Sequence, residues 1–136
     1  MVYCYALCAM NAENTLQLFE DAYGGGEEVI QLPPEDPTEI ICVIHPTDEH
    51  PEWSRAVAAI EKSVPHVHRI TTETYRMIRG VLHLHCDDEV HRLVEGDVYV
   101  VHPGQVHWGE TKEDDDLAIV DVECRPGWTA EDHILV

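Results

Sequence analysis

The sequence is poor in basic residues, and lysine in particular is almost absent. Lys62 and Lys112 are the only lysines, and 8 lysines and arginines stand against 27 acidic residues, which gives a formal net charge of -19. A surface with this charge repels phosphate backbones and anionic lipid headgroups. The composition therefore argues against nucleic acid and against a membrane as partners.

A long apolar run is also missing. The apolar stretch Met1–Met10 contains no lysine or arginine and is too short for a secretory signal core with its flanks. No other run approaches the roughly 20 apolar residues that a membrane-spanning helix needs. We therefore expect a cytoplasmic protein.

Paired cysteine motifs are absent as well. The five cysteines are an odd number, are widely spread and form no C-x-x-C pair: Cys4, Cys8, Cys42, Cys86 and Cys124. This usage fits reduced thiols better than a disulfide framework. We expect each cysteine to be a small apolar filler rather than a ligand or a nucleophile.

The length and the hydrophobic content of the chain are sufficient for one compact domain. The chain has 136 residues, of which 44% are hydrophobic, and this length supports a single core. We expect an N-terminal extension with a short helix (1–38), a β-rich core (39–123) and a C-terminal tail (124–136).

Helical spacing of Leu16, Phe19 and Tyr23 predicts an amphipathic helix from Asn11 to Tyr23. Asn14 is its candidate cap, and the three glycines that follow Tyr23 are its stop. The apolar stripe of this helix is expected to pack against the core or against a second subunit.

Beyond the helix, short runs rich in β-forming residues alternate with turn residues. The predicted strands cover 28–32, 40–44, 55–63, 66–68, 74–78, 81–86, 89–93, 97–101, 106–108 and 117–123. Many short strands at this spacing indicate a sandwich or a barrel. The tail begins with a Pro-Gly turn, and two roles are open for it. It docks on this core as a plain tail, which we favour, or it lays Trp128 or His133 over the mouth of the barrel.

Three metal-ligand side chains fall within eight residues, at His66, His68 and Glu73. Side chains two apart on a strand point the same way, so His66 and His68 can present imidazoles to one ion. Glu73 follows at an odd spacing, so a turn or bulge near residues 70–72 must bring its carboxylate back to them. Two imidazoles and a carboxylate suit a first-row transition metal.

A second stretch, from Gly96 to His107, reads as turn, strand, Pro-Gly turn and a histidine that begins the next strand. His107 is therefore a candidate fourth ligand. Another group, His83 and His85, also has ligand-like spacing. It shares a strand with Leu82 and Leu84, however, and the leucines are the natural interior choice, so both histidines are expected to face outward.

The first stretch resembles motif 1 of the cupin superfamily, in which His-x-His, four residues, Glu, six residues and Gly follow in order. His66, His68, Glu73 and Gly80 fit it, whereas Ile60 stands where the motif has its leading glycine. The second stretch resembles cupin motif 2.

In motif 2, Gly96, Gly104 and His107 are in place, and the departures are His102 for the usual proline and Thr111 for the usual asparagine. Neither departure affects a ligand. The resemblance covers roughly residues 55–123 and implies a double-stranded β-helix, or jelly-roll, barrel with a metal held inside near one open end. It also implies a homodimer.

Three further residues are candidates for chemistry. Tyr75 shares the face of Glu73 by the period of two, so its phenol could act as acid or base, whereas Met77 on the same face is expected to be core. Arg79 has the same parity and could clamp a substrate carboxylate or phosphate. His102 is a candidate positioning residue for the site.

The ligand set accepts one divalent manganese, iron, cobalt, nickel or zinc ion. The first hypothesis is a metal-dependent isomerase or lyase that acts on a small polar molecule such as a sugar or organic acid; an iron-dependent dioxygenase is a variant of it. The second is a non-enzymatic module that binds a small ligand and reports it. The third, a structural or storage protein, leaves the ligand pattern unexplained.

Overall fold

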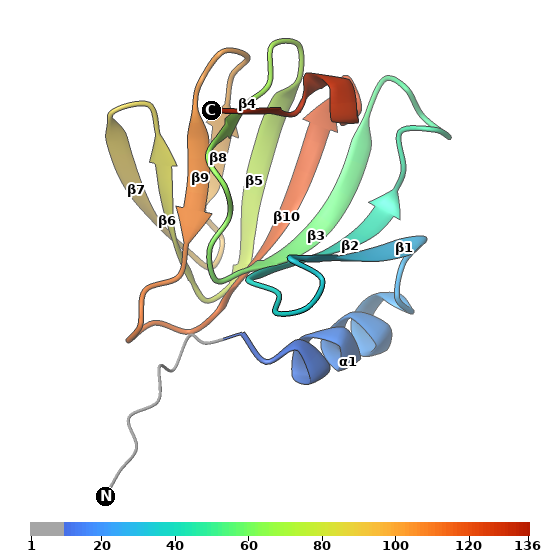
Figure 1. Ribbon diagram of the computed structural model, residues 1–136, viewed down its shortest axis with the longest axis vertical. Coiled ribbons are helices and arrows are strands. Elements are labelled where there is room, and N and C mark those ends of the chain that lie inside the picture. Colours follow the sequence, from blue (N-terminus) through green and yellow to red (C-terminus); the bar gives the residue numbers. More distant parts are fainter. Residues whose placement is uncertain (1–9) are drawn as a thin grey trace, which may run out of the picture.

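The computed structural model describes residues 10–136 and folds them into two facing antiparallel sheets (Figure 1). The six-stranded sheet has, in spatial order, β1 (Glu28–Leu32), β2 (Glu39–His45), β3 (Ser54–Ile60), β10 (Ala118–Arg125), β5 (Thr72–Arg79) and β8 (Val98–Val101). The five-stranded sheet has β11 (Ile134–Leu135), β4 (His66–Val67), β9 (His107–Glu110), β6 (Val81–Cys86) and β7 (Glu89–Val94). The predicted all-β jelly-roll barrel is confirmed.

The core lies between the sheets and is built from alternate residues of each strand. Leu82 and Leu84 are fully buried there, and Tyr75 and Met77 from the opposite sheet are buried against them. His83 and His85 consequently face outward, where His85 Nε2 lies 2.7 Å from a Glu110 carboxylate oxygen. The prediction that the leucines, and not these histidines, point inward is confirmed.

The strand predicted over 55–63 ends earlier, at Ile60. The chain then leaves the six-stranded sheet and crosses to the five-stranded sheet, which it enters at His66. It returns to the six-stranded sheet at Thr72, so the motif 1 residues His66 and Glu73 lie on different sheets.

Helix α1 (Ala12–Tyr23) covers the outer face of the six-stranded sheet. Phe19 is fully buried beneath it, and Leu16 and Tyr23 pack around the same cluster, as their spacing predicted. The predicted cap was wrong: Asn11 caps the helix, and its side chain accepts a hydrogen bond from the Asn14 N–H at 3.0 Å. Gly24 ends the helix in the left-handed conformation, with φ of 61°.

Cys42, Cys86 and Cys124 are buried and free, as expected for reduced thiols. The predicted apolar segment before Met10, with Cys4 and Cys8, lies outside the described residues. Among residues 10–136, no helix has both the length and the apolar character needed to cross a membrane.

Candidate metal centre

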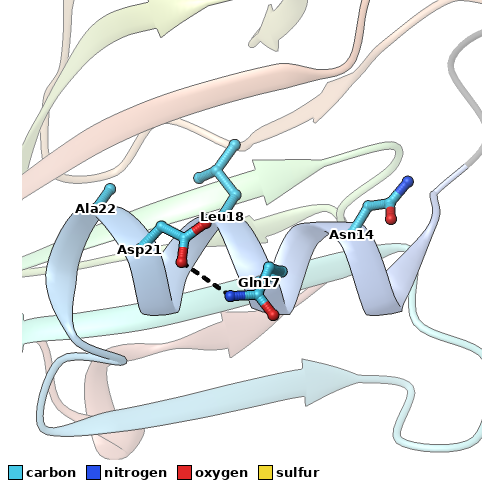
Figure 2. A pocket seen from close by; sticks show the side chains of 5 residues that line it. All are labelled: Asn14, Gln17, Leu18, Asp21 and Ala22. Atoms are coloured by element: carbon cyan, nitrogen blue, oxygen red, sulfur yellow. Dashed lines mark hydrogen bonds between the residues drawn. The ribbon is translucent and has the colours of Figure 1, made fainter.

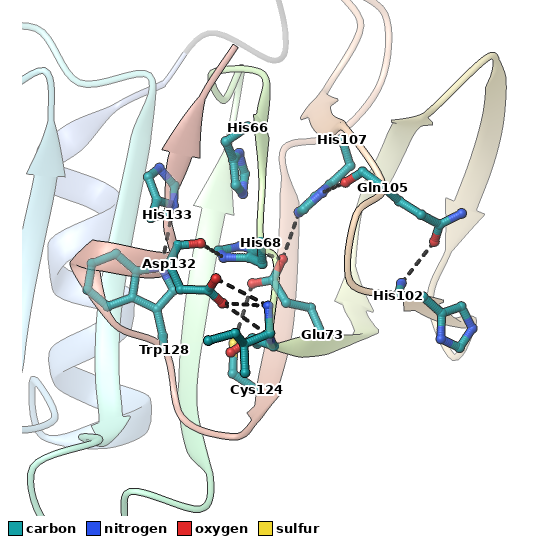
Figure 3. A network of polar contacts seen from close by, with 12 residues as sticks. His66, His68, Glu73, His102, Gln105, His107, Cys124, Trp128, Asp132 and His133 are labelled. Atoms are coloured by element: carbon teal, nitrogen blue, oxygen red, sulfur yellow. Dashed lines mark hydrogen bonds and ion pairs between the residues drawn. The ribbon is translucent and has the colours of Figure 1, made fainter.

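The four predicted ligands meet between the two sheets at one end of the barrel (Figure 3). His66 on β4 lies directly opposite His107 on β9 in the five-stranded sheet. Glu73 projects from the inner face of β5 in the six-stranded sheet, and His68 comes from the link between the sheets. All four side chains are buried, and their ligand atoms lie within 4.8 Å of one another. The convergence predicted from the sequence is therefore present.

A turn at residues 69–71 resolves the odd spacing between His68 and Glu73. The carboxylate of Asp132 accepts hydrogen bonds from the backbone N–H groups of Arg69 at 2.8 Å and Thr71 at 3.0 Å. The chain changes sheet at this turn, so Glu73 approaches the imidazoles from the opposite side. The prediction of a turn near residues 70–72 is confirmed.

Backbone carbonyls fix the orientation of each imidazole. The Nδ1 atoms of His66, His68 and His107 lie 2.8, 2.8 and 3.0 Å from the carbonyl oxygens of Val64, Asp132 and Gln105. A carbonyl oxygen only accepts, so in each neutral ring Nδ1 carries the proton and Nε2 keeps its lone pair. The rings are therefore in the tautomer that a metal ligand requires.

The ligand atoms form a possible cation site. Glu73 Oε1 lies 2.7 Å from His107 Nε2 and 3.3 Å from His68 Nε2, and this buried His68 atom has no hydrogen-bond partner. Three lone pairs and a carboxylate facing one another in a dry interior repel unless a positive charge separates them. A divalent ion meets this need, and the imidazole and carboxylate set fits first-row transition metals.

The pKa values of these groups reflect the same crowding. Burial and the neighbouring His107 lower the pKa of His66 to about 4. Burial opposes ionisation of Glu73, but the nearby imidazoles of His107 and His68 bring its pKa well below its usual range. Burial lowers the pKa of His68, but Glu73 outweighs it and the net shift is upward.

The metal-free protein should lose stability on acidification. The pKa of His66 is about 4 in the folded state and returns to the ordinary 6.5 on unfolding. Between these two values the unfolded chain binds more protons than the folded chain, so the free energy of unfolding decreases as the pH is lowered. The loss from His66 is at most about 3 kcal/mol. His68, whose folded pKa is raised, contributes in the opposite sense, with stability that is lost above pH 6.5.

Urea denaturation of metal-free protein at several pH values between 4 and 6.5 measures this effect. His66→Gln should flatten the pH dependence, whereas the same change at the exposed His102 should leave it unaltered. A His66→Gln variant with the wild-type pH dependence would contradict the assignment.

Two residues whose pKa values depend on Glu73 were missed or misjudged in the sequence. Cys124, expected to be an apolar filler, donates from Sγ to Glu73 Oε2 at 3.4 Å, and burial raises the pKa of its thiol well above the usual value. Glu39 lies on the inner side of β2, two residues before Ile41, which packs on the interior core. Burial and the charge of Glu73 raise the pKa of Glu39 to about 7. Neither residue belongs to a motif, so no sequence signal marked them.

The tail reaches the centre, as one of the two expectations for it stated. The ring of His133 stacks on that of His66, with centroids 4.3 Å apart. Trp128 Nε1 donates to His133 Nδ1 at 3.4 Å. Asp132, which sequence reasoning did not single out, contacts both the 69–71 turn and His68.

Of the three candidates for chemistry, only Tyr75 lies beside the ligands. Its side chain is buried, and its ring meets that of His107 edge-on at 6.3 Å between centroids. Burial, followed by the Glu73 charge, raises the pKa of Tyr75 well above its usual value.

The structure does not bring Arg79 and His102 to the ligands. An irregularity in the pairing of β5 with β10 interrupts the period of two, so Arg79 lies opposite Ile119 and lines a hollow beside α1 on the outer face. The imidazole of His102 is exposed and points away from the ligands (Figure 3). Its backbone N–H donates to Gln105 Oε1 at 2.8 Å, so it serves the turn before His107.

A second hollow lies along the outer side of α1 (Figure 2), and the six-stranded sheet separates it from the ligands. It is open and is lined by Asn14, Gln17, Leu18, Asp21 and Ala22, with a hydrogen bond of 2.8 Å between Gln17 and Asp21. Its residues suggest no chemistry.

A jelly-roll barrel with a buried cluster of three histidines and one glutamate defines the class of protein. The sequence profile of the family described as "Cupin domain" matches residues 56–123, half of the chain. The chain therefore belongs to the cupin family, as the two motifs indicated. The comparison with curated protein sequences finds no match.

Solved structures show the same fold at low sequence identity. Pac13 of Streptomyces, described as a nucleoside dehydratase, has a TM-score of 0.61 and 15% identity over 73% of this chain and 78% of its own. KdgF from Halomonas sp. has a TM-score of 0.59 and 15% identity over 74% and 88%. Oxalate decarboxylase of B. subtilis has a TM-score of 0.63 and 15% identity over 73% of this chain and 28% of its own.

Proposed function

We propose that this protein is a metal-dependent enzyme of the lyase or isomerase type that acts on a small polar molecule such as a sugar or an organic acid. The observation that carries the proposal is the set of three imidazole lone pairs and one carboxylate, fixed by backbone carbonyls and gathered in a buried site. A purely structural β protein has no need of such a set, because burying it costs free energy unless an ion is bound.

Nε2 of His66, His68 and His107 and a carboxylate oxygen of Glu73 would hold one divalent manganese, iron, cobalt, nickel or zinc ion. When bound, such an ion supplies a Lewis acid that stabilises negative charge developing on a substrate oxygen. The protein contributes the orientation of the ligands and a site from which the surrounding side chains exclude water.

Tyr75 is the candidate acid. Its raised pKa keeps the phenol protonated at neutral pH, so Tyr75 would donate a hydrogen bond from Oη to a substrate oxygen near the ligands, and would pass on its proton only to a strongly basic oxygen formed in the reaction. An arginine clamp is not part of the proposal, since Arg79 lies on the outer face beside α1.

The structural neighbours favour the lyase branch. Of the similar proteins described above, two carry names that state a reaction, a nucleoside dehydratase and an oxalate decarboxylase. Loss of water or of carbon dioxide passes through negative charge on a substrate oxygen, which the proposed ion would stabilise. The identities of 15% leave the substrate to be found by assay.

Turnover tests this proposal. Protein loaded with each of the five metals is assayed against keto sugars, uronates, hydroxy acids and nucleosides. We expect turnover of one class, and Tyr75→Phe should lower kcat by about 10²-fold or more if Tyr75 donates the proton. Tyr99→Phe is the matched control, because Tyr99 lies opposite Tyr75 on β8 and its hydroxyl contacts His91 Nε2 at 3.1 Å.

Ligand binding without turnover by metal-loaded protein would favour the sensing module instead. Oxygen consumption confined to the iron form would favour the dioxygenase. Turnover unchanged in Tyr75→Phe would remove Tyr75 from the proposal.

A further inference from the structure

The C-terminal segment, residues 126–136, returns to the metal centre after the barrel is complete (Figure 3). β11 pairs with β4, so that Leu135 lies opposite His66. The start of the segment is held by Ser54, whose Oγ accepts from the Trp128 N–H at 2.9 Å, and by Thr47, which donates to the Trp128 carbonyl at 2.6 Å. The segment is thus fixed at both ends across the mouth of the barrel.

Asp132 makes the contacts that distinguish this segment from a simple docking strand. Its side chain is buried, and its two oxygens accept from three consecutive N–H groups, those of Arg69, Ile70 and Thr71, at 2.8 to 3.2 Å. These residues form the turn between His68 and Glu73. A carboxylate that satisfies three otherwise unpaired donors holds such a turn in one conformation.

The backbone of the same residue acts on a ligand directly. The Asp132 carbonyl accepts from His68 Nδ1 at 2.8 Å. This contact sets both the tautomer and the direction of the His68 ring, and it leaves Nε2 facing Glu73 without a hydrogen bond. One residue therefore positions both the turn and the imidazole at its start.

His133, the residue after Asp132, packs against the cluster of ligand side chains. The ring of His133 covers that of His66, and Trp128 donates to His133. The glycine between Pro126 and Trp128 is needed for this path, because a Cβ there would lie 2.7 Å from the Thr47 side chain.

We propose that the C-terminal segment is an integral part of the metal centre, with Asp132 as the positioning residue that sets metal affinity through His68. The inference rests on the metal binding proposed above. It differs from a docking role in its consequence: loss of a docking contact lowers stability alone, whereas loss of Asp132 changes how tightly and in what geometry the folded protein holds its ion.

The experiment compares Asp132→Ala with Glu131→Ala in the full chain. Glu131 is the adjacent carboxylate, is exposed and belongs to the same short 3-10 turn, η1 (Ala130–Asp132). Affinity for Zn²⁺ and Co²⁺ is measured by competition with a chelator, and the visible absorption of the Co²⁺ form reports coordination. We expect Asp132→Ala to bind about 10- to 100-fold more weakly with an altered Co²⁺ spectrum, and Glu131→Ala to match wild type in both.

Asp132→Asn provides a second variant should Asp132→Ala fail to fold by circular dichroism. Asparagine keeps one acceptor for the turn and loses the other, so an affinity between those of wild type and Asp132→Ala is expected. Wild-type affinity and spectrum in the folded variants would overturn the inference while leaving the metal site intact. Wild-type protein that binds neither ion would instead overturn the proposed function itself.

Discussion

Protein carrying both His68→Ala and Glu73→Ala is expected to lose its bound metal. The two changes remove ligands from different parts of the fold, the inter-sheet link and the inner face of β5, and leave His66 and His107 on neighbouring strands. Two imidazoles without a carboxylate neither complete a coordination shell nor balance the charge of a divalent ion. Content should fall from about one ion per chain to near zero.

Elemental analysis of protein purified without a histidine tag measures this content. The matched control is His85→Ala with Glu110→Ala, which removes an imidazole and a carboxylate that lie 2.7 Å apart on the outer face of the five-stranded sheet. The control should retain its metal. Retention by the His68 and Glu73 variant as well would show that the ion is bound elsewhere, and the proposed centre would be rejected.

Replacement of Gly80 by alanine is expected to have the largest effect on stability. Gly80 joins β5 to β6 with φ of +79°, and a Cβ there would overlap the Leu117 carbonyl and lie 2.8 Å from the Asp116 oxygen. Both obstacles are backbone atoms, so the β10 side of the barrel must move to admit a methyl group. We expect a loss on the order of 4 kcal/mol or more, the range reserved for backbone clashes and similar defects.

Gly96→Ala is the control that separates the steric clash at Gly80 from the free-energy cost of placing a non-glycine residue at a positive φ. Gly96 also has a positive φ, +90°, but nothing lies within 4 Å of its missing Cβ. Its replacement should cost only the roughly 1 to 2 kcal/mol of a left-handed residue. Urea midpoints of the two variants provide the comparison. Equal losses would show that the contact with Leu117 relaxes without cost.

Local sequence determined the parts of this protein that depend on neighbours in the chain. Alternation along 81–86 predicted which side of β6 is buried, because successive side chains on a strand face opposite ways. The spacing of His66, His68 and Glu73, together with His107, predicted the cluster of ligand side chains. The cupin motifs then supplied the jelly-roll topology, which periodicity alone left open between a sandwich and a barrel.

The period of two failed where pairing became irregular. Arg79 has the parity of Glu73 in the sequence, but the register shift between β5 and β10 turns it to the face under α1. A register shift depends on the partner strand, about 40 residues away along the chain. Its position therefore could not be inferred from the segment that contains Arg79.

Tertiary structure alone decided what surrounds the cluster. Asp132 reaches the turn after His68, Cys124 reaches Glu73, and each contact joins residues more than 50 positions apart. Such contacts follow from how the strands close into a barrel and where the tail crosses it, and no local pattern records that path. The sequence thus determined which atoms can bind an ion, whereas the fold decided which atoms hold them in place.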